Sequence, residues 1–187
     1  MANENLLPDE LAKAARTLEE RFQMLRVPAR KTTPEEWNAV PTAIRRHIPP
    51  WIEALLSQFA LAEGVLEYRD HKHSYPRQFS LYKPDEYAHE LKEPEFGCLG
   101  ILPQHGYVPI AYEQDGNMWV VQVVGGPTGK IYFLNSSDWN GDEPTLHNGL
   151  VFASSRLSLL FASMGVSEVS YYESPDGITS LIWNEEK

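Results

Sequence analysis

The chain has 187 residues, of which 42% are hydrophobic and 22% charged, and this length and composition fit one soluble globular domain. Its formal net charge of -10 at pH 7 disfavours a nucleic-acid or anionic-membrane surface, because both need clustered Lys and Arg. No segment approaches the roughly 18 apolar residues of a membrane span, no signal-peptide pattern opens the sequence, and the lone Cys98 excludes an internal disulfide, so we expect a cytoplasmic protein.

Two helices are expected before residue 46. In residues 8–26 the apolar side chains recur at three- and four-residue spacings, which is one stripe of a helix: Leu11, Ala14, Ala15, Leu18, Phe22 and Leu25. A second helix begins at Pro34, because Thr33 can cap it and Glu36 stands where a capping box needs a glutamate. We expect residues 1–45 to form a helical extension of a main domain over residues 46–187.

A third helix begins at Pro50 within "IPPWIEALLSQFALAEGVLEY". Its large apolar residues are spaced to face a core: Trp51, Leu55, Leu56 and Phe59. Gly64 then ends or redirects the chain toward a first strand. The following segment, 69–92, is polar and has no sustained period, so we expect a loop that contains one short strand near residues 79–82.

Four apolar runs come next, and they predict strands that continue into an antiparallel meander: "FGCLGILP", "YVPIAYE", "MWVVQVV" and "KIYFLN". The third run is apolar at alternate and intervening positions alike, so its strand should be central and covered on both faces. Asp115 and Gly116 form the pair typical of a hairpin turn, because glycine supplies the positive φ that the bend requires.

The turn "GGPTGK" ends in a glycine-lysine pair, which raises the question of a phosphate-binding loop. Such a loop needs glycine, four residues, Gly-Lys-Ser/Thr and then a helix. Here Val124 stands at the first glycine position, Ile131 follows Lys130, and a strand is expected next. We therefore interpret Gly125, Gly126 and Gly129 as turn residues.

The last third of the chain is expected to contain a loop, a helix and a hairpin. Residues 136–149 are polar and carry an acidic cluster around Trp139, namely Asp138, Asp142 and Glu143. The run "LVFASSRLSLLFASM" predicts one helix over residues 150–164, and alternating runs around "SPDG" predict a hairpin at about 167–184. The expected fold class is α+β, with a single, mostly antiparallel sheet flanked by helices.

The segment from Ile48 to Met164 resembles the SUKH superfamily, in particular its Smi/Knr-like branch of cell-wall-regulator-like and bacterial immunity proteins. Three stretches carry the resemblance: "IPPWIEALLSQF" leading to "GVLEY", the hairpins of "IAYEQDGNMWVVQVVGGPTGKIYFLN", and "LVFASSRLSLLFASM". The family often has Asn-Gly after its first helix, where this chain keeps only Gly64 in "ALAEG". Residues before Ile48 and after Met164 fall outside the resemblance.

The resemblance implies a non-catalytic immunity protein that binds a cognate bacterial toxin. A charge of -10 would attract a basic partner such as a nuclease-like toxin. The candidate partner-binding residues are Asp138, Trp139, Asp142, Glu143, Tyr68 and Asp70. Two questions stay open at this loop. Trp139 is either a partner contact or a half-buried anchor. Its acidic neighbours form either a binding patch or part of a solvated loop.

Two other functions remain as alternatives. The first is a general intracellular interaction module on the same fold. The second is a metal-dependent hydrolase that uses His71 and His73, with Asp70 adjacent and a third ligand from His89, His105 or His147. The spacing of these residues matches no metal motif, Cys98 lies in an apolar run where burial would make it unreactive, and no serine has the nucleophile-elbow pattern. We therefore expect no enzyme activity and no cofactor or metal.

Overall fold

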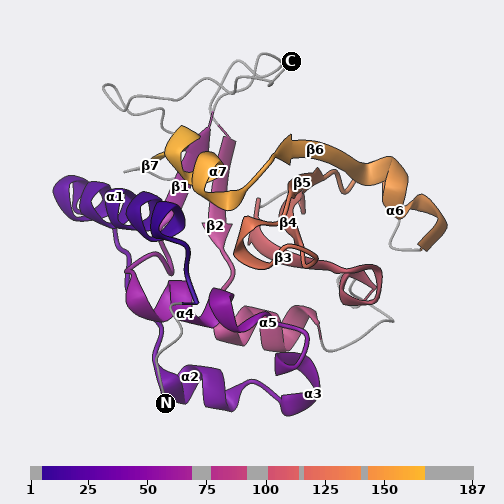
Figure 1. The fold of residues 1–187 in the computed structure, drawn as a ribbon, viewed down its shortest axis with the longest axis horizontal. Coiled ribbons are helices and arrows are strands. Elements are labelled where there is room, and N and C mark those ends of the chain that lie inside the picture. The colour runs from indigo at the N-terminus through magenta and orange to yellow at the C-terminus, as the bar shows by residue number, and fades with distance from the viewer. Residues whose placement is uncertain (1–5, 69–76, 92–100, 114–115, 140–142, 167–187) are drawn as a thin grey trace.

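The structure, a computed structural model, describes residues 6–68, 77–91, 101–113, 116–139 and 143–166 (Figure 1). These residues form an α+β fold with one seven-stranded sheet in the order β6-β5-β4-β3-β2-β1-β7. Each pair of neighbouring strands is antiparallel. The expected fold class is confirmed.

The strands are β1 (Val65–Tyr68), β2 (Arg77–Leu81), β3 (Tyr107–Tyr112), β4 (Met118–Gln122), β5 (Ile131–Leu134), β6 (Leu150–Ser154) and β7 (Gly165–Val166). The α-helices are α1 (Asp9–Leu25), α2 (Pro34–Ala39), α3 (Thr42–Arg45), α4 (Pro50–Gln58), α5 (Pro84–Glu90), α6 (Glu143–Gly149) and α7 (Leu157–Ser163). Two 3-10 helices, η2 (Leu102–His105) and η3 (Gly126–Thr128), complete the set in the described ranges. In Figure 1, α1 lies beside α7, α2 and α3 lie near α5, and α6 extends beyond β6.

Strand β4 is an interior strand of the sheet, between β5 and β3, as its sequence predicts. Met118, Trp119, Val120 and Val121 are all buried, so both of its faces are covered by packing partners. The Trp119 ring packs in tilted and edge-on contacts against Phe79 of β2 and Phe133 of β5, at ring-centroid distances of 5.0 and 5.4 Å. Aromatic contacts of this kind contribute about 0.5–1.5 kcal/mol each beyond their buried area. Here they stabilise the packing of side chains from β2, β4 and β5.

The turns around β4 are built by glycine, as expected. Gly116 precedes β4 with φ +89°, and Gly126 follows it with φ +58°. A Cβ on Gly129 would lie 2.1 Å from the carbonyl oxygen of Gln122, so only glycine fits there without moving backbone. Lys130 is exposed and runs directly into β5. This segment is therefore a sheet turn.

The N-terminal helices share one core with the sheet. Leu11, Ala15, Leu18 and Phe22 of α1 are buried and belong to the same apolar cluster as the central strands. The guanidinium Nη1 of Arg21 donates to the carbonyl of Met164, just after α7, at 2.9 Å. The division predicted at residue 45 therefore does not coincide with a gap in the core.

Gly64 has a packing reason that the sequence did not reveal. A Cβ at this position would lie 2.4 Å from the Phe22 ring, because α1 crosses the chain where it enters β1. Only glycine lets the ring approach this closely. The residue expected to redirect the chain is thus also a contact between the N-terminal helix and the sheet.

The helix predicted over residues 150–164 is wrong. Residues 150–154 instead form β6, which pairs with β5 from Leu134↔Leu150 to Ile131↔Ser154, and only 157–163 form the helix α7. The hydroxyl of Ser154 donates to the carbonyl of Arg156 at 3.0 Å and closes the bend between them. Hydrogen bonds available from the edge of β5 outweigh the helical spacing of this short apolar run.

Three further expectations differ from the structure. Residues 84–90, expected in a loop, form α5; its start shows the usual sequence signal, because Pro84 is its first residue and Glu86 accepts from the Lys83 amide at 2.8 Å. Residues 101–103, the described part of a strand expected over 96–103, lie in a turn and in η2. The acidic loop contains α6. The hairpin expected at about 167–184 lies outside the described residues.

Helix α5 packs on β3 through tyrosines. The Tyr87 hydroxyl donates to the Pro109 carbonyl at 2.7 Å, and the Tyr112 hydroxyl donates to Oε1 of Glu86 at 2.8 Å. Burial raises the pKa of Tyr87 well above its ordinary value, and burial together with the Glu86 hydrogen bond raises the pKa of Tyr112. Both phenols therefore stay neutral hydrogen-bond donors.

Candidate protein-binding surface

The antiparallel sheet brings the ends of several strands together. Tyr68 pairs with Arg77 across β1 and β2, Glu113 pairs with Asn117 beyond β3 and β4, and Leu134 pairs with Leu150 across β5 and β6. These three places lie at the same end of the sheet, which we call the loop end. Neighbouring strands are about 4.8 Å apart, so segments far apart in the sequence meet there.

A buried ion pair holds the loop end together. Arg77 of β2 pairs with Glu113, and their side chains are only 12% and 6% exposed. The Arg77 guanidinium also lies 4.9 Å from the centroid of the Phe133 ring, which attracts its positive charge. The Asn117 side chain donates to Oε2 of Glu113 at 2.9 Å. One carboxylate thus links β2, β3 and the start of β4.

The network continues into the acidic loop. Oδ1 of Asn117 accepts from the amide of Ser136, the second residue after β5, at 3.0 Å. The amide of Asn135 donates to the Gly149 carbonyl at 2.9 Å, and its side-chain Nδ2 donates to Asp138 at 2.7 Å. The exposed Asp138 is therefore held in a defined position on the sheet.

Trp139 is not available to a partner. Its side chain is only 4% exposed and belongs to the core cluster. A Cβ on Gly149 would lie 2.8 Å from the Cβ of Trp139, so the tryptophan fills the space under the end of α6. The interpretation of Trp139 as a partner contact is therefore wrong, because its ring packs in the core. The alternative, a loop anchor, is correct, and the ring is more deeply buried than the half-buried anchor that was expected.

The other candidate residues are less completely described. Tyr68 ends β1, where its backbone pairs with Arg77, and Glu143 is the first residue of α6. Five candidates, Asp70, His71, His73, Asp115 and Asp142, lie outside the described residues, as does Cys98. Arg77, Glu113 and Asn117 were missed by sequence reasoning, because nothing in their local patterns shows that three strand ends meet.

Two segments at the loop end are acidic in sequence: the one that joins β3 to β4 and the one that joins β5 to β6. Residues 113–117 contain two carboxylates, and residues 135–149 contain three. Neither segment contains Lys or Arg. Arg77 pairs with the carboxylate of Glu113. These two segments of the sequence therefore carry net negative charge, whereas residues 69–77, which lead from β1 into β2, contain Arg69, Lys72 and Arg77 against Asp70.

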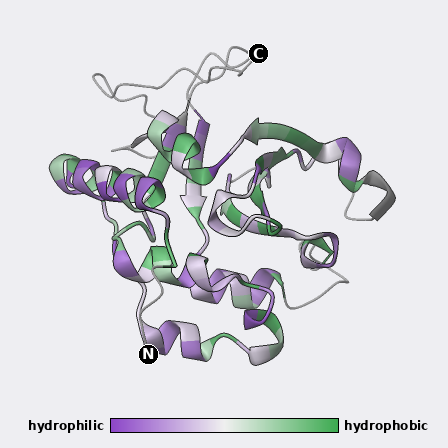
Figure 2. Ribbon diagram, viewed as in Figure 1, coloured by the Kyte–Doolittle hydropathy of each residue, from purple (hydrophilic) through white to green (hydrophobic). Residues whose placement is uncertain are grey.

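Strand β6 forms the neighbouring apolar surface. Val151 and Phe152 are 54% and 48% exposed, and Figure 2 shows the strand as a hydrophobic ribbon at one side of the sheet. The Phe152 ring lies 6.0 Å from that of Tyr132, which lies 5.7 Å from that of Tyr107. The pKa of Tyr107 is raised by burial and then by nearby Tyr132. Tyr107, Tyr132 and Phe152 thus form an aromatic row across the sheet.

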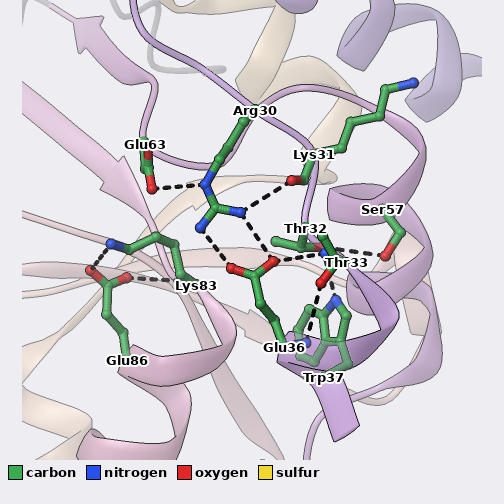
Figure 3. Close-up of polar contacts among 10 residues, drawn as sticks. All are labelled: Arg30, Lys31, Thr32, Thr33, Glu36, Trp37, Ser57, Glu63, Lys83 and Glu86. Carbon is green, nitrogen blue, oxygen red and sulfur yellow. Dashed lines mark hydrogen bonds and ion pairs between the residues drawn. The ribbon is translucent and has the colours of Figure 1, made fainter. Parts of the chain in front are cut away.

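A second polar cluster, around Arg30, has a structural role (Figure 3). Arg30 donates to Glu36 of α2 at 2.7 and 3.0 Å and to Glu63, just before β1, at 2.8 Å. Its backbone pairs with Ala62 in both directions. The Trp37 indole donates to Thr32 Oγ1 at 2.9 Å. These contacts attach α2 to the start of the sheet, and the Glu36 carboxylate is already engaged as an acceptor.

The histidines do not form a recognisable centre in the described part of the chain. His89, His105 and His147 lie on α5, η2 and α6 respectively. Among the described residues no group of three or more His, Cys, Asp or Glu side chains could hold a metal ion. In the same residues, no helix has the length and apolar character to cross a membrane.

Comparison of the chain with models of protein families, with curated proteins and with solved structures gives no match. The loop end and β6 must therefore be interpreted from their own chemistry. They combine the exposed Asp138, held by Asn135, with the exposed apolar residues Val151 and Phe152, and exposed apolar surface beside polar groups is typical of protein-binding surfaces.

Proposed function

We propose that this chain is an immunity protein that neutralises a cognate bacterial toxin by direct binding in the cytoplasm. The observation that supports it most is the juxtaposition of the acidic loop end with the exposed apolar strand β6. The resemblance of residues 48–164 to the SUKH superfamily points in the same direction. The role is binding, and the toxin is inhibited by occlusion.

The electrostatics favour a basic toxin, such as a nuclease-like domain. A net charge of -10 accelerates encounter with a positively charged protein, and acidic loops fixed at one end of the sheet orient that encounter. Fixing Asp138 through Asn135 reduces the entropy that the loop loses on binding. Apolar contact at Val151 and Phe152 then supplies the desolvated part of the interface.

The ionisable groups at the loop end suit a scaffold better than a reaction centre. Glu113 is engaged by both Arg77 and Asn117, which keeps it an anchored acceptor. Asp138 is exposed and accepts a hydrogen bond from Asn135. Acid-base catalysis needs groups whose environments separate their pKa values. These contacts instead order a surface.

Co-expression with the product of the adjacent gene tests the proposed function. We expect that product to arrest growth alone, this chain to restore growth, and the two proteins to co-purify in a defined ratio. A matched strain should express this chain with the unfolding variant Gly129→Val, which should fail to rescue. If the neighbouring product is harmless and does not bind, the immunity role is contradicted and a general interaction module is favoured.

A further inference from the structure

Strand β6 leaves one side of the sheet unprotected. It is the terminal strand of the sheet in the described residues, so one of its edges has no strand partner there. Such an edge presents backbone N–H and C=O groups that can pair with another chain, and proteins usually protect it with charge, proline or brevity. Residues 150–154, "LVFAS", contain neither charge nor proline, and the register irregularity of the β5–β6 pair, which can also protect an edge, lies between Phe152 and Ser154. Within the described residues the opposite edge strand, β7, has only two residues.

The side chains of β6 extend this edge into a surface. Val151 and Phe152 are consecutive, so they project from opposite faces of the strand, and about half of each is exposed. A strand laid beside β6 would therefore find apolar contact on both of its faces. On one face the contact continues along the aromatic row, because Phe152 packs on Tyr132.

We propose that β6 is the site where a partner protein adds an antiparallel strand whose apolar run is followed by Lys or Arg. The direction follows from the structure: β6 begins at the acidic loop end, so an antiparallel guest finishes there. Basic residues after its apolar run would lie against Asp138 and its neighbours. This inference rests on the proposed function, and it specifies the binding mode of the toxin.

Other occupants fit the edge less well. A second copy of this chain also carries a charge of -10, so like charge opposes self-pairing while it attracts a basic guest. Every strand pair in the sheet is antiparallel, which favours the same geometry for the guest.

Synthetic peptides test the edge without knowledge of the toxin. The probe alternates valine and threonine over the length of β6 and ends in lysines; a second peptide of equal composition begins with the lysines. We expect the first to bind the full chain more tightly in fluorescence anisotropy. It should also shift the backbone amide resonances of residues 150–154 in nuclear magnetic resonance spectra. Equal binding of both peptides, or shifts elsewhere, would overturn the proposal.

Val151→Lys and Met24→Lys form a matched pair of variants. Both replace an exposed apolar residue by lysine; Val151 is 54% exposed and Met24 is 73% exposed. Val151 lies on β6, whereas Met24 lies on α1, outside the proposed site. We expect Val151→Lys to weaken the peptide by about tenfold or more, because it loses apolar burial and adds repulsion. Met24→Lys should change affinity by no more than about twofold. Equal effects of the two variants would refute an edge site.

The toxin assay separates this inference from the proposed function. If the chain rescues growth and Val151→Lys rescues equally well, the immunity role stands and the β6 mode fails. If no toxin is found while the peptide still binds β6, the edge site stands and the immunity role fails. Light scattering supplies the remaining check: a dimer that Val151→Lys converts to a monomer would assign β6 to a second copy and overturn the proposal.

Discussion

The ion pair between Arg77 and Glu113 shows how a single contact orders the loop end. Replacing a buried pair by apolar groups is often neutral, whereas removing one partner leaves a buried charge that is costly. Here the carboxylate also accepts from Asn117, which in turn accepts from Ser136. Loss of Arg77 should therefore disturb the turn before β4 and the acidic loop after β5 together.

Arg77→Met should destabilise the protein by about 3–5 kcal/mol, because the Glu113 charge is left in a site that excludes water. The double variant Arg77→Met with Glu113→Gln should recover most of this loss, since the amide keeps an oxygen for Asn117 and carries no charge. Urea unfolding of the natural protein, of each single variant and of the double variant measures the four free energies that the comparison needs. An additive double variant would show that the two side chains do not act as a pair.

Trp139 makes a different point at the same scale. A tryptophan beside acidic residues has the composition of an interface anchor, yet its ring is buried under α6. Local composition cannot distinguish these outcomes, because the deciding fact is whether the sheet end offers an apolar site. The exposed apolar residues that do face solvent, Val151 and Phe152, lie on the strand that follows.

Among the elements, α2 combines a local signal with a tertiary one. Thr33 and Glu36 form the predicted capping box, in which Glu36 accepts from the Thr33 amide at 2.7 Å. Arg30 reaches the same carboxylate and also Glu63. Hydrogen bonds from Arg30 and then from the Thr33 backbone lower the pKa of Glu36 below its ordinary 4.5. The Glu36 side chain thus fixes α2 in two ways: it caps the helix N-terminus, and it pairs with Arg30.

The lowered pKa of Glu36 predicts an acid dependence. A depressed folded-state pKa contributes stability above the unfolded value of 4.5, and this contribution is lost as the pH falls through the folded value. Glu36→Gln should therefore be less stable than the natural protein at neutral pH and lose less stability on acidification. Urea unfolding at a series of pH values below neutral measures both effects.

The neighbouring exposed Glu35 supplies the control. Glu35→Gln removes the same charge from the first turn of α2 without touching the contacts of Arg30. We expect it to keep the acid dependence of the natural protein. If Glu35→Gln and Glu36→Gln flatten the profile equally, the effect belongs to the helix dipole and not to the Arg30 contacts.

At the scale of the whole molecule, sheet order decides which charges lie together. The sheet places Glu113 and Asn117, beyond β3 and β4, and Asn135 and Gly149, between β5 and β6, at one end. The segments to which they belong, residues 113–117 and 135–149, contain no Lys or Arg. An acidic end of this kind acts on association rate and orientation more than on final affinity. The effect of this acidic end on the association rate should fall with added salt, because charges are screened over about 10 Å at an ionic strength of about 0.1 M.

Reversing Asp138, Asp142 and Glu143 to Lys together should slow association with the co-expressed toxin by about tenfold or more at low salt and weaken its salt dependence. Reversal of the exposed Glu20, Glu35 and Asp85 changes net charge equally at α1, α2 and α5. This control should slow association less. Stopped-flow measurements at several ionic strengths give both rates; equal slowing would mean that net charge, and not the loop end, steers the encounter.

The sequence by itself determined the elements whose signals are local. Periodic apolar spacing specified α1, capping residues specified α2, and Pro50 with its apolar face specified the start of α4. Apolar runs separated by glycine turns specified β3, β4 and β5. Each of these signals acts over a few residues, so the structure that it predicts depends little on contacts with distant parts of the chain.

Only the tertiary structure decided the rest. Residues 150–154 have the spacing of a helix but become β6, because β5 offers a row of unpaired backbone groups beside them. The Arg77 and Glu113 network, the burial of Trp139 and the single core that includes α1 all join residues distant in sequence. Such contacts depend on which strands are neighbours, and no local pattern carries that information.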